Sequence, residues 1–240
     1  MTWRYPDSPG STIGRSALDD LPAGYIAELK MDGWRCVIEK TAAEAYRFTT
    51  RHKKPCPVGA DTRLLVRDAL RGLPVGSIVD SEWMARRPAA RDEAIWFFDL
   101  LQWGGVELYG LSAAERLDAL RQHVAPAHIV PTSTGNYAEF FDALAKRGDA
   151  EGVVLKRGGS KYIGSYRECA TNPAWVRCRW RSGEDGMTSL ISTFRLRPAA
   201  IRPQPEPIRN NERSRQRVLL TGLGCLSGQQ DLFSGLDTQR

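Results

Sequence analysis

The sequence has few of the residues that build covalent or metal-centred scaffolds. It contains five cysteines, an odd number, with no Cys-x-x-Cys spacing among them, and its three histidines do not cluster with the cysteines. These absences argue against a disulfide framework and against a structural zinc site. A reducing, cytoplasmic compartment is therefore the expected location.

Long apolar segments are also missing. No run approaches the roughly 20 residues that a transmembrane helix needs, and residues 1–14 lack the apolar core of a signal peptide. We therefore expect no membrane partner. The content of 42% hydrophobic and 26% charged residues is typical of a soluble globular chain, and the net charge of +6 is compatible with an anionic partner.

Strand patterns dominate the chain between residues 25 and 180. Alternating, β-branched and aromatic runs predict strands over 25–30, 34–40, 45–50, 77–84, 95–101, 151–157 and 175–180. Apolar spacing predicts helices over 61–70, after a capping box at 112–115, and over 137–146. The Asp32-Gly33 pair predicts a tight connection between the first two strands. Because most strands follow each other without a helix between them, we predict an α+β fold of antiparallel β-sheets flanked by helices.

Composition divides the chain into three parts. Residues 1–20 are polar and rich in turn formers, which predicts a loosely packed lead-in, and residues 21–182 hold the predicted sheets. Residues 183–240 are rich in proline and arginine, with four prolines between positions 198 and 207. We therefore predict a largely extended or disordered C-terminal tail.

Charged residues interrupt several of the predicted strands. Those on or beside strands are Glu28, Lys30, Arg35, Arg51, Glu82, Glu151, Lys156, Arg177 and Arg179. Buried charges are costly unless they are paired or bound to a ligand, so the pattern favours a polar cleft over an apolar core. Arg177 and Arg179 are two residues apart and share one face of a strand. The plainer alternatives are a surface lysine on a hairpin for Lys30, half of a buried ion pair for Glu82 and a core residue for Phe98.

In this order and spacing, the segments resemble the motifs of the covalent nucleotidyltransferases, which are DNA ligases, RNA ligases and mRNA capping enzymes. The segments are 28–35, 50–51, 78–82, 96–101, 151–156 and 175–179. Further segments at 107–108, 111–117 and 160–167 resemble ATP-dependent DNA ligases most, and the resemblance covers residues 24–181. It implies the ligase adenylation fold, which is similar to ATP-grasp. A complete OB-fold is not expected, because the residues after Arg181 do not supply the roughly five strands of that barrel.

The resemblance implies an ATP-dependent DNA ligase that forms phosphodiester bonds in DNA repair, replication and recombination, with ATP and Mg²⁺ as cofactors. Lys30 would attack the α-phosphate of ATP and carry AMP as a covalent adduct. AMP would then pass to the 5′-phosphate of a nick in double-stranded DNA, and the 3′-hydroxyl would displace it and seal the nick. The alternatives are an RNA ligase or capping-type enzyme, or a non-catalytic relative that binds nicks or nucleotides.

The same resemblance implies a role for each site residue. Glu28 would lie beside the adenine, Phe98 would stack on it, and Glu82 would hold the ribose hydroxyls. The residues on the phosphate side would be Arg35 and Arg51 at the sugar and phosphates of AMP or the 5′-phosphate of the nick, Glu151 at a divalent metal, and Lys156, Arg177 and Arg179 around the α-phosphate.

Two features depart from the family pattern. Ligases of this family usually carry Lys-x-Lys where this chain has Arg177-Cys178-Arg179, so planar guanidinium forks replace compact ammonium groups. The OB-fold that normally clamps DNA is not predicted either. We expect the arginines of the tail or a partner chain to supply that contact, and we otherwise expect a monomer.

Overall fold

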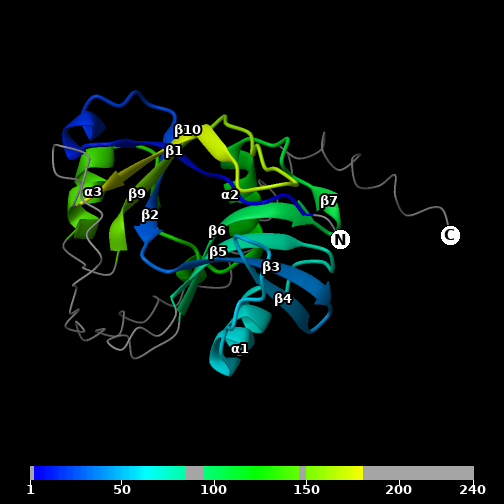
Figure 1. Cartoon of the computed structure of the whole chain (residues 1–240). Helices are drawn as coiled ribbons and strands as arrows, with labels where there is room; N and C mark the ends of the chain where they lie inside the picture. The colour runs from blue at the N-terminus through cyan, green and yellow to red at the C-terminus, as the bar shows by residue number, and fades with distance from the viewer. Residues whose placement is uncertain (1–2, 85–93, 146–149, 181–240) are drawn as a thin grey trace, which may run out of the picture. The chain divides into compact units, whose positions relative to one another are not determined.

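Two five-stranded sheets organise the part of the chain described in a computed structural model, which covers residues 3–84, 94–145 and 150–180 (Figure 1). All of these residues belong to the first of two units into which the chain divides, Met1–Pro198. The predicted tail at 183–240 lies outside the described residues, as does Lys146 at the end of a predicted helix.

The first sheet has the strand order β1-β10-β9-β2-β8 and the second has the order β4-β3-β5-β6-β7. The strands are β1 Ser8–Ile13, β2 Tyr25–Met31, β3 Trp34–Ala42, β4 Ala45–Thr50, β5 Ile78–Met84, β6 Ala94–Trp103, β7 Val106–Glu107, β8 Thr132–Ser133, β9 Ala150–Arg157 and β10 Thr171–Arg179. The helices are α1 Ala60–Ala69, α2 Ala113–His123 and α3 Tyr137–Ala145, with short 3₁₀ helices at Arg15–Leu18 and Pro126–His128. The predicted α+β class is confirmed.

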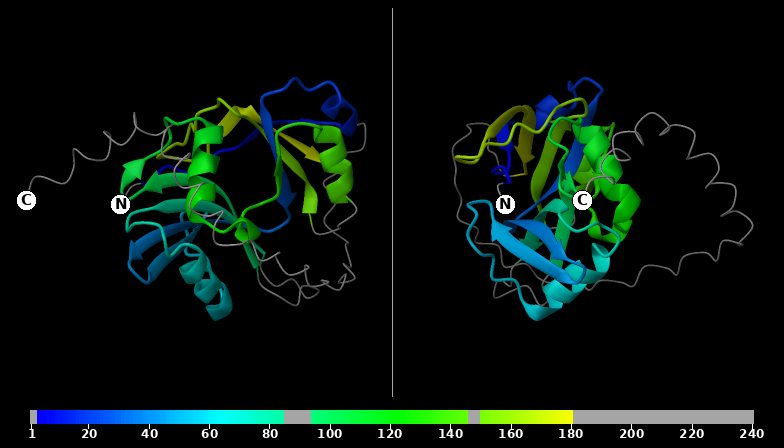
Figure 2. Two further views of the ribbon diagram at one scale, coloured as in Figure 1. Left: turned by 180° about the vertical axis from the view of Figure 1, so that it is seen from behind. Right: turned by 90° about the vertical axis from the view of Figure 1, so that its right-hand side faces the viewer.

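The helices cover the outer faces of the sheets. The helices α1 and α2 pack against the second sheet, and α3 lies against β9 of the first (Figures 1 and 2). The predicted capping box begins α2: the Ser112 hydroxyl accepts from the Glu115 amide, and the Glu115 carboxylate accepts from the Ser112 amide. No helix among the described residues is long and apolar enough to cross a membrane.

The tight connection predicted between the first two strands is present, but the two strands do not form a hairpin. β2 pairs with β9 and β8, whereas β3 pairs with β4 and β5, so the two strands belong to different sheets. The tight connection through Asp32 and Gly33 therefore carries the chain from one sheet to the other. Gly33 is needed there because a Cβ would lie 2.6 Å from the carbonyl oxygen of Trp83 and 2.8 Å from the sulfur of Met84.

The prediction that residues 1–20 form a loosely packed lead-in is wrong. Residues 8–13 form β1, which runs parallel to β10 and is an exception to the predicted antiparallel pairing. The whole domain separates β1 from β10 in the sequence, so no hairpin constrains their direction. The side chain of Asp7 is buried and accepts hydrogen bonds from the amides of Ile163 and Gly164, at 2.8 and 2.7 Å.

The two sheets touch through an apolar cluster on their inner faces. Its members are Trp3, Val37, Ile78, Leu101, Tyr109, Tyr162 and Trp175. Val37, Ile78 and Leu101 come from the second sheet, and Trp175 comes from β10 of the first. Burial of these large side chains holds the inner faces together beside the polar residues described next.

Candidate active site

A cleft between the inner faces of the two sheets gathers the predicted site. Its volume is about 820 Å³, and residues of β2, β3, β5, β6, β9 and β10 line it. All ten residues singled out in the sequence line this cleft: Glu28, Lys30, Arg35, Arg51, Glu82, Phe98, Glu151, Lys156, Arg177 and Arg179. The expected polar cleft is confirmed, whereas the chemical role of each residue stays a prediction.

Lys30 reaches the cleft through the alternation of β2. Ala27, Leu29 and Met31 pack into the core beneath α3, so Glu28 and Lys30 point to the opposite face. The side chain of Lys30 is only 19% exposed. The alternative of a surface lysine on a hairpin is therefore wrong.

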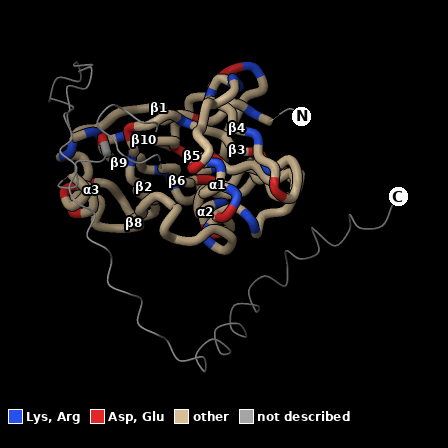
Figure 3. The backbone as a smooth tube through the Cα atoms, turned by 90° about the horizontal axis from the view of Figure 1, so that it is seen from below, with Lys and Arg blue, Asp and Glu red and all other residues tan. Residues whose placement is uncertain are grey.

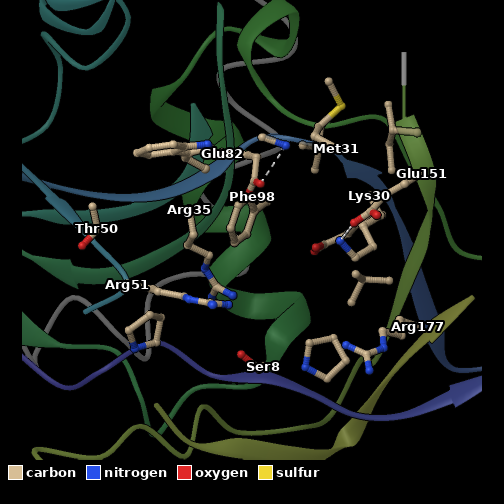
Figure 4. Close-up of a pocket in the computed structure, with 18 of the residues that line it drawn as sticks. Ser8, Lys30, Met31, Arg35, Thr50, Arg51, Glu82, Phe98, Glu151 and Arg177 are labelled. Atoms are coloured by element: carbon tan, nitrogen blue, oxygen red, sulfur yellow. Dashed lines mark hydrogen bonds and ion pairs between the residues drawn. The ribbon is translucent and has the colours of Figure 1, made fainter. Parts of the chain in front are cut away.

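A bulge in β9 brings Glu151 to Lys30. Lys30 pairs with Gly152 and Met31 pairs with Ala150, so Glu151 is an extra residue without a partner on β2. Bulges re-aim a side chain, and the Glu151 carboxylate forms an ion pair with the Lys30 ammonium (Figure 4). The Nε atom of Arg179 lies 3.6 Å from the second carboxylate oxygen.

A second bulge presents Phe98. Asp80 pairs with Asp99 and Ser81 pairs with Phe97, which leaves Phe98 as the extra residue of β6. Phe97 is buried in the core under α1 and α2, whereas Phe98 lines the cleft. The guanidinium carbon of Arg35 and the Nζ atom of Lys156 lie 5.0 and 5.2 Å from the centre of its ring. A lysine or arginine cation beside an aromatic ring is attracted electrostatically to the face of the ring.

Four buried charges extend from the cleft to α2. Lys156 Nζ lies 2.9 Å from Glu28 and 3.4 Å from Asp99, and Arg116 donates to both oxygens of Asp99 at 2.8 and 3.1 Å. Two cations thus balance two carboxylates. Burial raises the pKa of Glu28 to about 7, although Lys156 opposes the shift. Burial would also raise the pKa of Asp99, but Arg116 and Lys156 together hold that pKa below its usual value.

Arg35 is held by a second buried network. Its guanidinium donates to both oxygens of Asp80, at 2.8 and 2.5 Å, and to the carbonyl of Asp7 at 2.7 Å. Tyr162 also donates to Asp80, at 3.1 Å. A phosphate would therefore have to share Arg35 with Asp80. In the same way, a phosphate would share Lys156 with Glu28 and Asp99.

Glu82 lies in the cleft without a direct ion pair among the described residues. Its carboxylate accepts from the Gly33 amide at 3.1 Å. Burial raises the pKa of Glu82 to about 7, and the charges of Lys30 and Arg35 only partly oppose this. The alternative that Glu82 is half of a buried ion pair is therefore wrong.

Comparisons with known proteins point to one family. The chain is 28% identical over 220 residues to a protein of Pseudarthrobacter chlorophenolicus named "Probable DNA ligase", which covers 74% of this chain and 41% of the relative. It is 30% identical over 195 residues to a protein of the same name from Beutenbergia cavernae, covering 69% of this chain and 36% of the relative. No protein-family model matches the chain.

Solved structures give the same family. The ligase domain of LigD from M. tuberculosis has 25% identity and a TM-score of 0.54, over 71% of this chain and 60% of that one. A mycobacterial DNA ligase D complexed with ATP and MES has 25% identity and a TM-score of 0.50, over 65% of this chain and 54% of that one. The chain carries an adenylation domain of the ATP-dependent DNA ligase family. It spans only 41% and 36% of the length of the two curated relatives.

Three further arginines of this adenylation domain, Arg51, Arg177 and Arg179, line the same cleft. Arg177 and Arg179 share the cleft face of β10, as their spacing predicted. Arg51 follows β4, and its Nε atom donates to His52 at 3.0 Å. Figure 4 shows Lys30 and Glu151 on one side of the cleft and Arg35 and Arg51 on the other. Along the described backbone, positions of Lys and Arg are interspersed with positions of Asp and Glu (Figure 3).

The carboxylates of the adenylation domain fit a Mg²⁺ ion that is shared with a nucleotide. The described residues contain no group of three or more His, Cys, Asp or Glu side chains that could hold a metal alone. Mg²⁺ is usually bound through one or two carboxylates together with substrate phosphates and waters. Glu151 and Glu82 both line the cleft and supply such oxygens.

Sequence reasoning assigned no role to several residues that shape the site. Asp80 and Asp99 lay within recognised segments, but their partners Arg35 and Arg116 are distant in the sequence. Trp34 lines the cleft and is 54% exposed, which is unusual for a large aromatic side chain. Thr12, in the segment expected to be loosely packed, accepts a hydrogen bond from Arg177 at 2.7 Å. Thr12 and Arg177 are far apart in the sequence, so no local sequence pattern indicates that they are in contact.

Proposed function

We propose that this chain is the adenylating part of an ATP-dependent DNA ligase, in which Lys30 becomes covalently linked to AMP. The observation that carries the proposal is the position of the Lys30 amine. It lies in a cleft among carboxylates and arginines from both sheets, with an aromatic ring in the same cleft. The names of the curated relatives support DNA as the substrate.

In the proposed first step, Lys30 Nζ attacks the α-phosphorus of ATP. A phosphorus–nitrogen bond forms, the bond to the β-phosphate oxygen breaks, and pyrophosphate leaves. A lysine must lose its proton to act as a nucleophile. Glu151 forms an ion pair with this amine, and in this proposal the proton passes from the amine to solvent water. The arginines neutralise the charge that develops on the phosphates.

The adenylate is then transferred and released. The 5′-phosphate of a DNA nick attacks the phosphorus, the bond to Lys30 breaks, and an adenylated DNA end forms. The 3′-hydroxyl of the nick displaces AMP in the last step, which makes the phosphodiester bond. Catalysis of this kind depends mainly on in-line placement and charge neutralisation.

The other cleft residues bind and orient ATP in this proposal. Phe98 stacks on the adenine, Glu28 lies beside it, and Glu82 accepts from the ribose hydroxyls. Bound Mg²⁺, held by Glu151 together with the phosphates, would neutralise phosphate charge. Arg51, Arg177 and Arg179, which line the cleft, contact the phosphates.

Intact mass after incubation with ATP and Mg²⁺ tests the proposal. The native chain gains the mass of one AMP, and Lys30→Ala does not. Lys161→Ala is the matched control, because the side chain of Lys161 is exposed and does not line the cleft. A native chain without an adduct, or an adduct on Lys30→Ala, would refute the assignment.

A second stage separates the possible substrates. The adenylated chain is mixed with nicked DNA or with nicked RNA in the absence of free ATP. Loss of the protein adduct together with sealing of DNA is the expected result. Transfer to RNA alone would replace DNA by RNA as the substrate, and an adduct that transfers to neither would contradict the ligase reaction.

A further inference from the structure

The parallel pairing of β1 with β10 sets a threonine beside the arginine that replaces a lysine in the family pattern. Thr12 and Arg177 are direct partners in this pairing, so their side chains lie on the same face. The Nε atom of Arg177 donates to the Thr12 hydroxyl oxygen at 2.7 Å. We propose that Thr12 is a positioning residue, which anchors Arg177 so that its two terminal nitrogens face the phosphates of ATP.

The guanidinium group can bond Thr12 through one nitrogen and a phosphate through the other two. Arginine has one N–H on Nε and two N–H groups on each terminal nitrogen, arranged in a rigid planar fork. A hydrogen bond at Nε fixes the plane of the fork and leaves both terminal nitrogens to bind a phosphate in a bidentate way. Lysine has a single nitrogen on a flexible stem and cannot divide its donors in this manner.

Arg177 differs from Arg35 and Arg179, two of the other arginines that border the cleft, whereas Arg51 bonds through its Nε to the side chain of His52. Arg35 is bound to Asp80, and Arg179 lies 3.6 Å from Glu151. Within the described residues, Arg177 has no carboxylate partner closer than 4.0 Å, and the neutral Thr12 hydroxyl is its hydrogen-bond acceptor. A neutral anchor orients the cation without neutralising it, so the positive charge stays available to an anion.

Arginine at position 177 and threonine at position 12 thus act together, because Thr12 orients a guanidinium group that a lysine would not have. The expected consequence concerns the rate of the first step, because Arg177 acts where charge develops during attack by Lys30. The adenine and ribose contacts lie elsewhere in the cleft. Loss of the anchor should therefore lower the maximal rate of Lys30–AMP formation, and the ATP concentration that gives half-maximal rate should change little. This inference rests on the proposed adenylation of Lys30.

Four variants test the device: Thr12→Val, Thr12→Ser, Arg177→Lys and the double variant Thr12→Val/Arg177→Lys. Valine keeps the branched shape of threonine in a strand but removes the acceptor oxygen, and serine keeps the oxygen. The rate of adduct formation is measured by mass at increasing ATP. Thr12→Val should lower the maximal rate by about 10-fold, as expected for one hydrogen bond to a charged group. Thr12→Ser should retain most of the native rate.

The double variant separates positioning from a general effect on β1. In the Arg177→Lys background, Thr12→Val should have no further effect, since lysine has no Nε donor to anchor. An equal loss in both backgrounds, a native rate for Thr12→Val, or no rescue by serine would overturn the role of Thr12. These results would leave the adenylation of Lys30 intact, whereas a native chain that forms no adduct would overturn both proposals. Thr12 is exposed, so the unfolding midpoints of all four variants should match.

Discussion

Replacement of Gly152 by alanine should damage both the stability and the chemistry of this domain. Gly152 lies between Lys30 on β2 and Arg179 on β10. Its φ angle is +152°, a conformation that side chains rarely adopt. An added Cβ would collide with the carbonyl oxygen of Cys178 and lie 2.8 Å from the Cα of Arg179. The strands β9 and β10 would have to separate at the point where the bulge presents Glu151.

Two costs set the size of the effect. The unfavourable backbone conformation contributes about 1–3 kcal/mol, and the forced separation of packed strands contributes a further ~1–3 kcal/mol. Their sum, about 4 kcal/mol, is a large share of the ~5–15 kcal/mol that stabilises a typical domain. With a urea dependence of ~2 kcal/mol per molar, the unfolding midpoint should fall by about 2 M.

Urea unfolding followed by circular dichroism measures this shift, and intact mass measures the Lys30 adduct in the same preparations. Gly159→Ala is the control, because no atom lies within 4 Å of a Cβ at that position. Its unfolding free energy should change by less than about 0.5 kcal/mol. A Gly152→Ala chain with native stability and a native rate of adduct formation would show that β9 has no such bulge in solution.

Two further substitutions test the nucleotide side of the cleft and its acidity. Phe98→Ala should weaken the apparent affinity for ATP by roughly 1–3 kcal/mol, the usual worth of base stacking on an aromatic ring, and an unchanged affinity in a titration would rule out that role. Glu82 has a pKa raised from 4.5 to about 7 in the folded chain. The folded state therefore binds this proton more tightly than the unfolded state, and the contribution of Glu82 to stability is lost as pH rises through this range. Glu82→Gln should remove on the order of 2 kcal/mol of this pH dependence, measured as the difference in unfolding free energy between pH 4.5 and pH 8; parallel pH profiles of the two chains would contradict the burial of this carboxylate.

The positions of the site residues along the chain could be predicted from the sequence, because the charges interrupt otherwise apolar strands in a recognisable order. Period-two alternation correctly placed Arg177 and Arg179 on one face. The same rule fails for Glu151 and Lys156, which are five residues apart and should point to opposite faces. Both line the cleft because the bulge in β9 adds one residue. A bulge depends on the pairing of two strands, so one strand alone carries no sign of it.

Long-range pairing explains the other errors. The Asp-Gly turn has the local chemistry of a hairpin, but β9 and β5 provide the actual partners of β2 and β3. The polar composition of residues 1–20 gives no indication of β1, because this strand pairs with β10 at the far end of the domain. Contacts of this kind are decided by the packing of the whole fold and override local preference.

The pairing of β1 also has a practical consequence for anyone who shortens this protein. A shortened chain that starts at residue 21, just before the first motif, would lack β1, the parallel neighbour of β10. The bare edge would offer unpaired amides and carbonyls to other chains, which is a common route to aggregation. It would also remove the acceptor of the Ile163 and Gly164 amides. An insoluble short version would therefore say nothing against catalysis, and the smallest workable version should keep Trp3 and everything that follows it up to β10.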